Sequence, residues 1–297
     1  MGYIQKNLMA GEKIAYEVFY FKYFGNMKKC LLFLMVTVVV LLFCSCGGKD
    51  NSVPIKSVTE TFTVNGVSFK MVKVEGGTFM MGATEEQGKD ASYDDMPSHS
   101  VTLDTYYIGQ TEVTQALWKA VMGDSIEDVN PSKNKGDKLP LESVSWKRFH
   151  DFIKKLNELT GKNFRLPTEA EWEFAARGGN YSKGFKYPGS DDLDDVAWYE
   201  DNSEGHTHEV ATKRPNELGI YDMGGNVTEW LEDWYGPYSA EVQTNPTGGK
   251  DNPYGMAERV ERGGNYNSNP KACTAWKRHS EMLLFTCNES YGFRLAL

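Results

Sequence analysis

The sequence predicts a single mixed α+β domain, from about residue 59 to residue 297, with much irregular structure. Three observations support this prediction. Two alternating β-prone runs flank Asn65-Gly66, three amphipathic helical patterns lie between residues 114 and 178, and the chain beyond Gly179 is mostly turns, aromatic residues and short strand candidates. No internal repeat and no second linker interrupts this region.

The first predicted element is a β-hairpin in ETFTVNGVSFKMVKV. Asn-Gly between two alternating runs is the preferred sequence of a two-residue hairpin turn, because both residues accept a positive φ. We therefore expect two antiparallel strands at the start of the domain.

Three helices follow, and each has recognisable end signals. Thr114 and Ser145 are expected N-caps, Gly161 suits the position just after the second helix, and Thr168 with Glu171 has the spacing of a capping box. The first helix would bury Leu117, Trp118, Val121 and Met122, and the second Phe149, Phe152, Ile153, Leu156 and Leu159.

The segment before the domain has the organisation of a secretion signal. Residues 27–46, MKKCLLFLMVTVVVLLFCSC, have a basic start and an apolar run that is shorter than a membrane span. The ending FCSC before two glycines is similar to a bacterial lipobox, with Cys46 as the lipidated first residue of the mature protein. We expect residues 1–26 to lie upstream of the true translation start. Residues 47–58 are expected to be a polar tether.

Charge and signal together indicate a location and exclude one class of partner. The chain carries a formal net charge of -9. This charge gives no indication of a basic face, which argues against nucleic acid as a partner. We expect a bacterial cell-envelope protein, anchored by lipid in the outer membrane and facing either the periplasm or the surface.

Several motifs resemble one known family. RLPTEAEWEFAARGG and YDMGGNVTEW are the most specific, and GGTFMMG, PLESVSW, RGGNY and GFRLAL occur in the same order as in the formylglycine-generating enzyme (sulfatase-modifying factor) family. The resemblance covers nearly all of residues 71–297 and implies a C-type-lectin-like fold. It does not imply one function, because the same domain occurs in oxidases and in binding proteins.

The enzymes of this family convert a sulfatase cysteine to formylglycine with O2 and a copper(I) ion held by two cysteines. In RGGNYNSNPKACTAWKRH, Cys273 occupies the second cysteine position, but Ser268 stands at the first and Asn265 replaces a serine. A hydroxyl is a poor ligand for Cu(I). The resemblance therefore predicts no copper site and leaves Cys273 as a candidate catalytic residue without its partner.

Three alternatives remain open for Cys273: a buried, unreactive thiol, a disulfide with Cys287, or a reactive thiolate whose pKa is lowered by Lys277 and Arg278. Cys287 is a further candidate for the missing copper ligand, from another loop, although no spacing rule supports this.

The resemblance implies a structural calcium site in YDMGGNVTEW. Its ligands would be the side chains of Asp222 and Glu229 and the backbone carbonyls of Gly225 and Val227, a set of hard oxygen atoms that suits Ca²⁺. The alternative is a turn in which the two carboxylates cap backbone amides. The five histidines form no metal signature.

Two functions remain from these observations. In the first, the domain is a calcium-stabilised binding or structural module, and an exposed surface binds a protein or glycan. That surface would comprise Tyr266, Trp276, Lys277, Arg278 and His279. In the second, the protein is an O2- and metal-dependent oxidase that generates formylglycine. We expect the first.

Overall fold

The structure is a computed structural model that describes residues 57–84, 87, 90–123, 130–248, 258–282 and 288–297. These residues belong to one compact unit, Ile55–Leu297. The predicted signal, its Cys46 and nearly all of the tether lie outside the described residues. None of the described helices is long and apolar enough to cross a membrane.

The unit begins with the predicted hairpin. Strands β1 (Thr59–Val64) and β2 (Val67–Val74) pair antiparallel, with Val64 opposite Val67, and β5 (Tyr106–Gly109) pairs with β2 on its other side. Asn65 and Gly66 form the turn, and both have positive φ, 46° and 85°. The hairpin prediction is confirmed, and it rests on the backbone freedom of these two residues.

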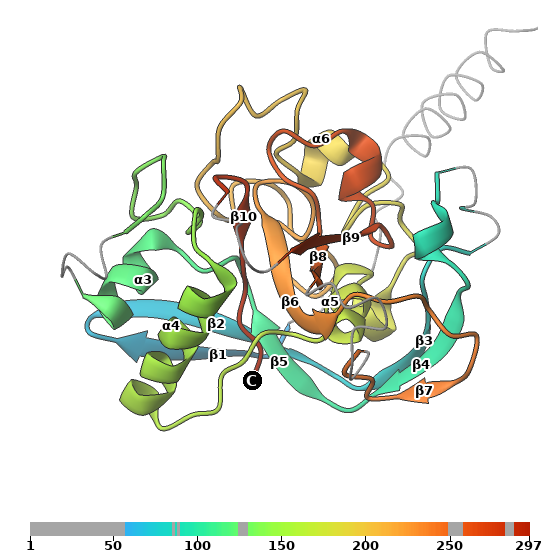
Figure 1. Ribbon diagram of the computed structural model, residues 1–297, viewed down its shortest axis with the longest axis horizontal. Coiled ribbons are helices and arrows are strands. Elements are labelled where there is room, and N and C mark those ends of the chain that lie inside the picture. Colours follow the sequence, from blue (N-terminus) through green and yellow to red (C-terminus); the bar gives the residue numbers. More distant parts are fainter. Residues whose placement is uncertain (1–56, 85–86, 88–89, 124–129, 249–257, 283–287) are drawn as a thin grey trace, which may run out of the picture. The chain divides into compact units, whose positions relative to one another are not determined.

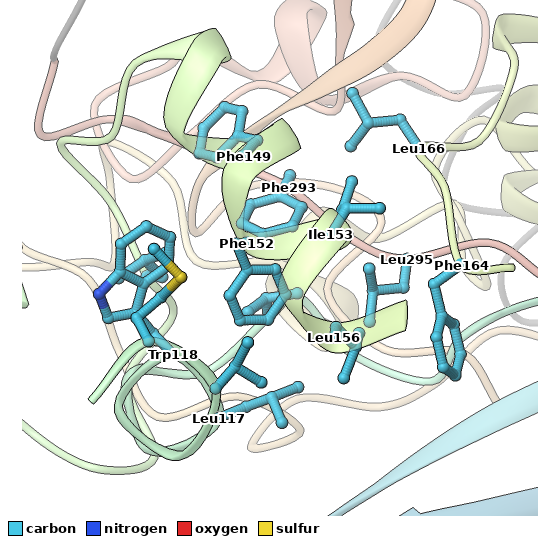
Figure 2. Packing of buried hydrophobic residues seen from close by; sticks show 14 of the residues in the cluster. Leu117, Trp118, Phe149, Phe152, Ile153, Leu156, Phe164, Leu166, Phe293 and Leu295 are labelled. Carbon is cyan, nitrogen blue, oxygen red and sulfur yellow. The ribbon is translucent and has the colours of Figure 1, made fainter. Parts of the chain in front are cut away.

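Helices α3 (Gln115–Met122) and α4 (Trp146–Thr160) pack against each other and against this hairpin (Figure 1). The Thr114 hydroxyl accepts a hydrogen bond from the Leu117 amide, and Gly161 ends α4 with a φ of 66°. Figure 2 shows the apolar side chains of α4 turned toward α3 and the C-terminal residues Phe293 and Leu295. This cluster is one half of the hydrophobic core.

One residue of the predicted α4 stripe is not in that core. Leu159 is 49% exposed, whereas Leu156, one turn earlier, is fully buried. Leu159 lies in the last turn of α4, beyond the edge of the packed face.

Two further sheets form the rest of the unit. One contains β3 (Gly77–Met81), β4 (His99–Leu103) and β7 (Gln243–Thr244). The other has the order β10–β6–β8–β9 and comprises β6 (Thr228–Trp234), β8 (Glu258–Arg262), β9 (Arg278–Met282) and β10 (Tyr291–Gly292). Between Trp230 and Trp234 the pairing of β6 with β8 shifts register, so β6 is irregular at its end.

Helix α5 (Glu169–Ala176) is central to this half, and all eight of its residues are buried. The predicted capping box is present, since the Thr168 hydroxyl accepts from the Glu171 amide and the Glu171 carboxylate accepts from the Thr168 amide. The shorter helices are η3 (Tyr93–Asp95), η4 (Gly179–Tyr181), α6 (Leu193–Val196) and η5 (Pro270–Cys273). The mixed α+β class predicted from the sequence is confirmed.

Candidate functional site

The segment from Arg262 to Arg278 connects β8 to β9, and α5 holds both of its ends. The Arg262 guanidinium lies 2.9 Å from Glu169 Oε1 and also pairs with Glu173, while Arg278 Nη2 lies 2.8 Å from Glu169 Oε2. All four side chains are almost completely buried. Removing one member would leave its partners as buried charges, so this network fixes where the segment begins and ends.

The network determines the charge of Glu169. Burial alone would raise the pKa of this carboxyl, but the adjacent Arg278 and Arg262 bring the pKa below its usual value. Glu169 is therefore an ionised structural group, and the Tyr238 hydroxyl donates a further hydrogen bond to it.

Cys273 lies in the interior of this segment, in η5, as a free and fully buried cysteine. It packs in a small apolar cluster with Tyr187, Leu193, Val196, Ala197 and Tyr199. Burial raises the pKa of the Cys273 thiol to about 12, although the nearby Gly225 amide lowers it. Lys277 and Arg278 do not activate it, since both are engaged with acidic residues elsewhere. Of the alternatives for Cys273, the structure shows the buried thiol; Cys287 lies outside the described residues.

Ser268, at the other cysteine position of the family motif, closes a turn. Its hydroxyl accepts a hydrogen bond from the Asn265 amide at 2.9 Å, and its own amide donates to the Asn265 carbonyl. Gly263 and Gly264 of the motif have positive φ, and Ser268 supplies turn geometry in place of a soft metal ligand.

Three of the five residues predicted to form an exposed ligand surface are buried. Tyr266, Trp276 and Arg278 are each 3% exposed or less, and Arg278 pairs with Glu169 of α5. Lys277 donates to Ser92 and Asp95 across the segment. Burial together with the positive charge of Lys277 lowers the pKa of His279 to about 4, so the imidazole is neutral at neutral pH.

Three of the predicted calcium ligands, Asp222, Gly225 and Val227, lie on the buried loop that leads into β6, and Glu229 is the second residue of β6. Oδ1 of Asp222 is buried without a hydrogen-bond partner, which suits a cation ligand, and Oδ2 accepts from the Ala211 amide. Both oxygens of Glu229 are already bonded, to Nε and Nη2 of Arg294 and to the Trp172 indole. The loop thus offers one open side-chain oxygen, and calcium binding there stays a prediction.

Glu229 and Arg294 are both buried, and Arg294 also donates to the carbonyls of Tyr221 and Asp222. A guanidinium therefore already ties the loop to the C-terminal residues that follow β10. Among the described residues, no group of three or more His, Cys, Asp or Glu side chains is arranged to hold a metal ion.

Sequence reasoning did not find one cavity of the described structure. It has a volume of about 610 Å³ and lies over the amino end of α5. Its lining includes Met81, His99, Asp233, Trp234, Tyr235, Tyr238 and Arg278. The signal was present in LEDWYGPY, where an acidic residue precedes three aromatic residues near the end of β6. His99 is 3% exposed and packs its ring against Tyr238.

These features agree with comparisons to known proteins. Residues 57–297 match the model of the sulfatase-modifying factor enzyme 1-like domain, and the chain belongs to this family. It is 34% identical over 260 residues to a protein named Chaperone protein LppX from Paenibacillus barcinonensis, covering 70% of this chain and 82% of that protein. It is 28% identical over 288 residues to the formylglycine-generating enzyme of Streptomyces coelicolor, covering 76% of this chain and 88% of the enzyme.

The solved structure of Treponema denticola variable protein 1 is similar to this one. The two align with a TM-score of 0.72 at 31% sequence identity, over 81% of this chain and 99% of that one. The predicted family and the fold of the formylglycine-generating-enzyme type are therefore confirmed. The family includes relatives with different names, so function must be argued from the site.

Proposed function

We propose that this chain is a binding or structural module that does not catalyse copper-dependent oxidation of cysteine. The observation that carries the proposal is the state of Cys273, which is fully buried among apolar side chains with its thiol pKa raised to about 12. Copper(I) sites need accessible thiolates, and the partner position holds a serine. In the motif that resembles an active site, Cys273 is a packed core residue.

The test is a Cu(I) titration of the purified protein against a competing chelator, followed by an assay for O2-dependent oxidation of a cysteine peptide. The proposal expects no submicromolar Cu(I) site that depends on Cys273 and no formylglycine product. Tight Cu(I) binding that disappears in Cys273→Ala, together with product formation, would establish the oxidase function instead. A Cys287→Ala variant shows whether the second cysteine contributes.

The oxidase remains the second candidate because of the resemblance to the Streptomyces coelicolor enzyme over 76% of this chain. It requires Cys273 to become exposed and to gain a second soft ligand. The two candidates make opposite predictions in the same titration.

We also propose that the module is an envelope lipoprotein held by a lipid on Cys46. The lipobox-like FCSC supports this, as does the relative named Chaperone protein LppX. Metabolic labelling with a fatty acid, followed by membrane fractionation, tests it. Label that is present in the wild type and lost in Cys46→Ser is expected. An unlabelled wild-type protein would contradict the lipid anchor, and recovery from the inner membrane would contradict the outer-membrane location.

Calcium is proposed as a stabiliser at Asp222, with the Gly225 and Val227 carbonyls as further ligands. The open Oδ1 of Asp222 supports this. A ligand that binds only the folded state raises its stability, so Ca²⁺ should raise Tm and EDTA should lower it. Asp222→Asn should reduce this response. An equal Tm of the wild-type protein with Ca²⁺ and with EDTA would contradict the calcium site and leave Arg294 as the sole cation of the loop.

A further inference from the structure

The cavity over the amino end of α5 contains one carboxyl group with no counter-ion. Asp233 is 3% exposed, and within the described residues its side chain forms no ion pair. Its Oδ2 accepts from the Glu169 amide at 2.9 Å, and Gly248 lies so close that an added Cβ would be 2.9 Å from Oδ1. Because Asp233 lines the cavity, its Oδ1 atom is available to interact with a ligand.

Asp233 differs in this respect from the acidic residue beside it. Glu169 forms ion pairs with two arginines, Arg262 and Arg278. Arg278 is the basic residue of the cavity lining, and its guanidinium pairs with Glu169 and donates to the Gly236 carbonyl. The charged groups that act on Asp233 are Glu169, Glu171, Arg278 and, from the neighbouring strand β8, Arg259. Burial and the charge of Glu169 raise the pKa of Asp233 to about 8, so the empty cavity holds a mostly protonated acid at pH 7.

The walls around this carboxyl favour positive charge. Trp234, Tyr235 and Tyr238 line the cavity, and each of these rings already packs against a guanidinium, at 3.5, 4.7 and 3.9 Å from the ring centroids. Aromatic faces attract cations, most strongly where water is excluded. The lining carries two carboxyls, Glu169 and Asp233, against one guanidinium.

We propose that this cavity binds an alkylammonium group, with the Asp233 carboxylate as its ionic partner and the aromatic rings as its walls. The volume of about 610 Å³ suits a small ligand or a long amine side chain. The ammonium would replace the proton that Asp233 carries in the empty state. The site deepens the binding role proposed above, and its failure would be distinct from that of the copper test.

The experiment is calorimetric titration with cadaverine and, as a matched neutral probe, 1,5-pentanediol. Cadaverine binds and pentanediol does not. Because only ionised Asp233 pairs with the amine, the affinity should rise about tenfold between pH 7 and pH 9. In buffers of different ionisation enthalpy, binding at pH 7 should release close to one proton from the protein. Asp233→Asn, which keeps an acceptor for the Glu169 amide, should lose at least tenfold in affinity and the proton release.

Asp137→Asn, which removes an exposed carboxylate outside the cavity lining, serves as the control and should bind like the wild type. The peptide acetyl-Ala-Lys-Ala-amide distinguishes two sources of the amine: binding tighter than cadaverine indicates a lysine side chain, and weaker binding a free amine. Equal binding of the diol, or binding by the wild type without proton release, overturns the proposal. So does the absence of cadaverine binding across this pH range.

Discussion

The interior of the 262–278 segment and the cavity over α5 are adjacent parts of the protein with opposite properties. In the segment, Cys273 is enclosed by apolar side chains, and the arginines at its two ends, Arg262 and Arg278, are paired with α5. In the cavity, Asp233 keeps an unpaired carboxyl beside accessible space. The segment that resembles the copper motif is thus closed to chemistry, while the cavity, whose lining was not predicted as a site, is open to a ligand.

The difference shows that charge pairing, more than burial, decides what these groups can do. Glu169 and Asp233 are both almost completely buried and are linked by one hydrogen bond. Two arginines lower the pKa of the first, whereas the second, without a counter-ion, has its pKa raised to about 8.

The largest expected effect comes from releasing the segment from α5. Arg262→Met would leave Glu169 and Glu173 with one arginine fewer in a buried site, and we expect a loss of about 3–5 kcal/mol in the free energy of unfolding, measured with urea. Arg214→Met, which breaks the exposed pair with Asp195, should cost less than about 1 kcal/mol. Equal losses in the two variants would show that the network does not anchor the segment.

A smaller loss is expected when the packing over Cys273 is disturbed. Gly264 has a φ of 66°, and an added Cβ would lie 3.1 Å from Cys273 Sγ. Gly264→Ala should therefore cost about 1–3 kcal/mol in urea unfolding. Gly184→Ala is the matched control, because Gly184 has a similar φ of 72° with nothing within 4 Å. Its loss should come from backbone strain alone and be the smaller of the two; the reverse order would mean that the thiol is not tightly enclosed.

The unpaired carboxyl should appear in the pH dependence of stability. Because the pKa of Asp233 is about 8 in the folded state and near its usual value of 3.8 when unfolded, the folded state holds the extra proton between these values. Stability therefore falls as pH rises from 5 to 8, and Asp233→Asn should reduce this slope by about 1 kcal/mol per pH unit. Glu261, with a pKa also raised to about 8, leaves a residual slope in that variant. An unchanged slope in Asp233→Asn would show that Asp233 is ionised in the folded state.

The smallest effect concerns Ser268. Removing its hydroxyl deletes the acceptor for the Asn265 amide, so Ser268→Ala should cost about 0.5–1.5 kcal/mol in urea unfolding. Cadaverine binding should be unchanged, since Ser268 is outside the cavity lining. A lost response to cadaverine would mean that the segment and the cavity are coupled.

The sequence allowed the elements with local signals to be predicted. The turn at Asn65-Gly66 and the caps at Thr114 and Thr168 depend on residues within a few positions of each other. The family motifs implied the fold and the absence of the first copper ligand at Ser268. These predictions needed no knowledge of distant contacts.

Burial in the candidate site could not be predicted in the same way. Arg278 pairs with Glu169, 109 positions earlier, and Glu229 pairs with Arg294, 65 positions later. The Arg278 side chain, which looks suited to a surface, is buried because the distant Glu169 pairs with it. The cavity was missed for the same reason, since its walls come from β3, β4, α5, β6, β7 and β9 and from the chain around β7.

The most direct test of the central claim is the reactivity of Cys273 in the folded protein. The protein would be treated with iodoacetamide at pH 7, 8 and 9, and peptide mapping would follow Cys273 separately from the other cysteines. With a thiol pKa of about 12 and no exposed surface, Cys273 should remain unmodified until the protein is unfolded in urea. Modification of Cys273 in the folded protein at pH 7 would show an accessible thiolate and contradict a closed segment.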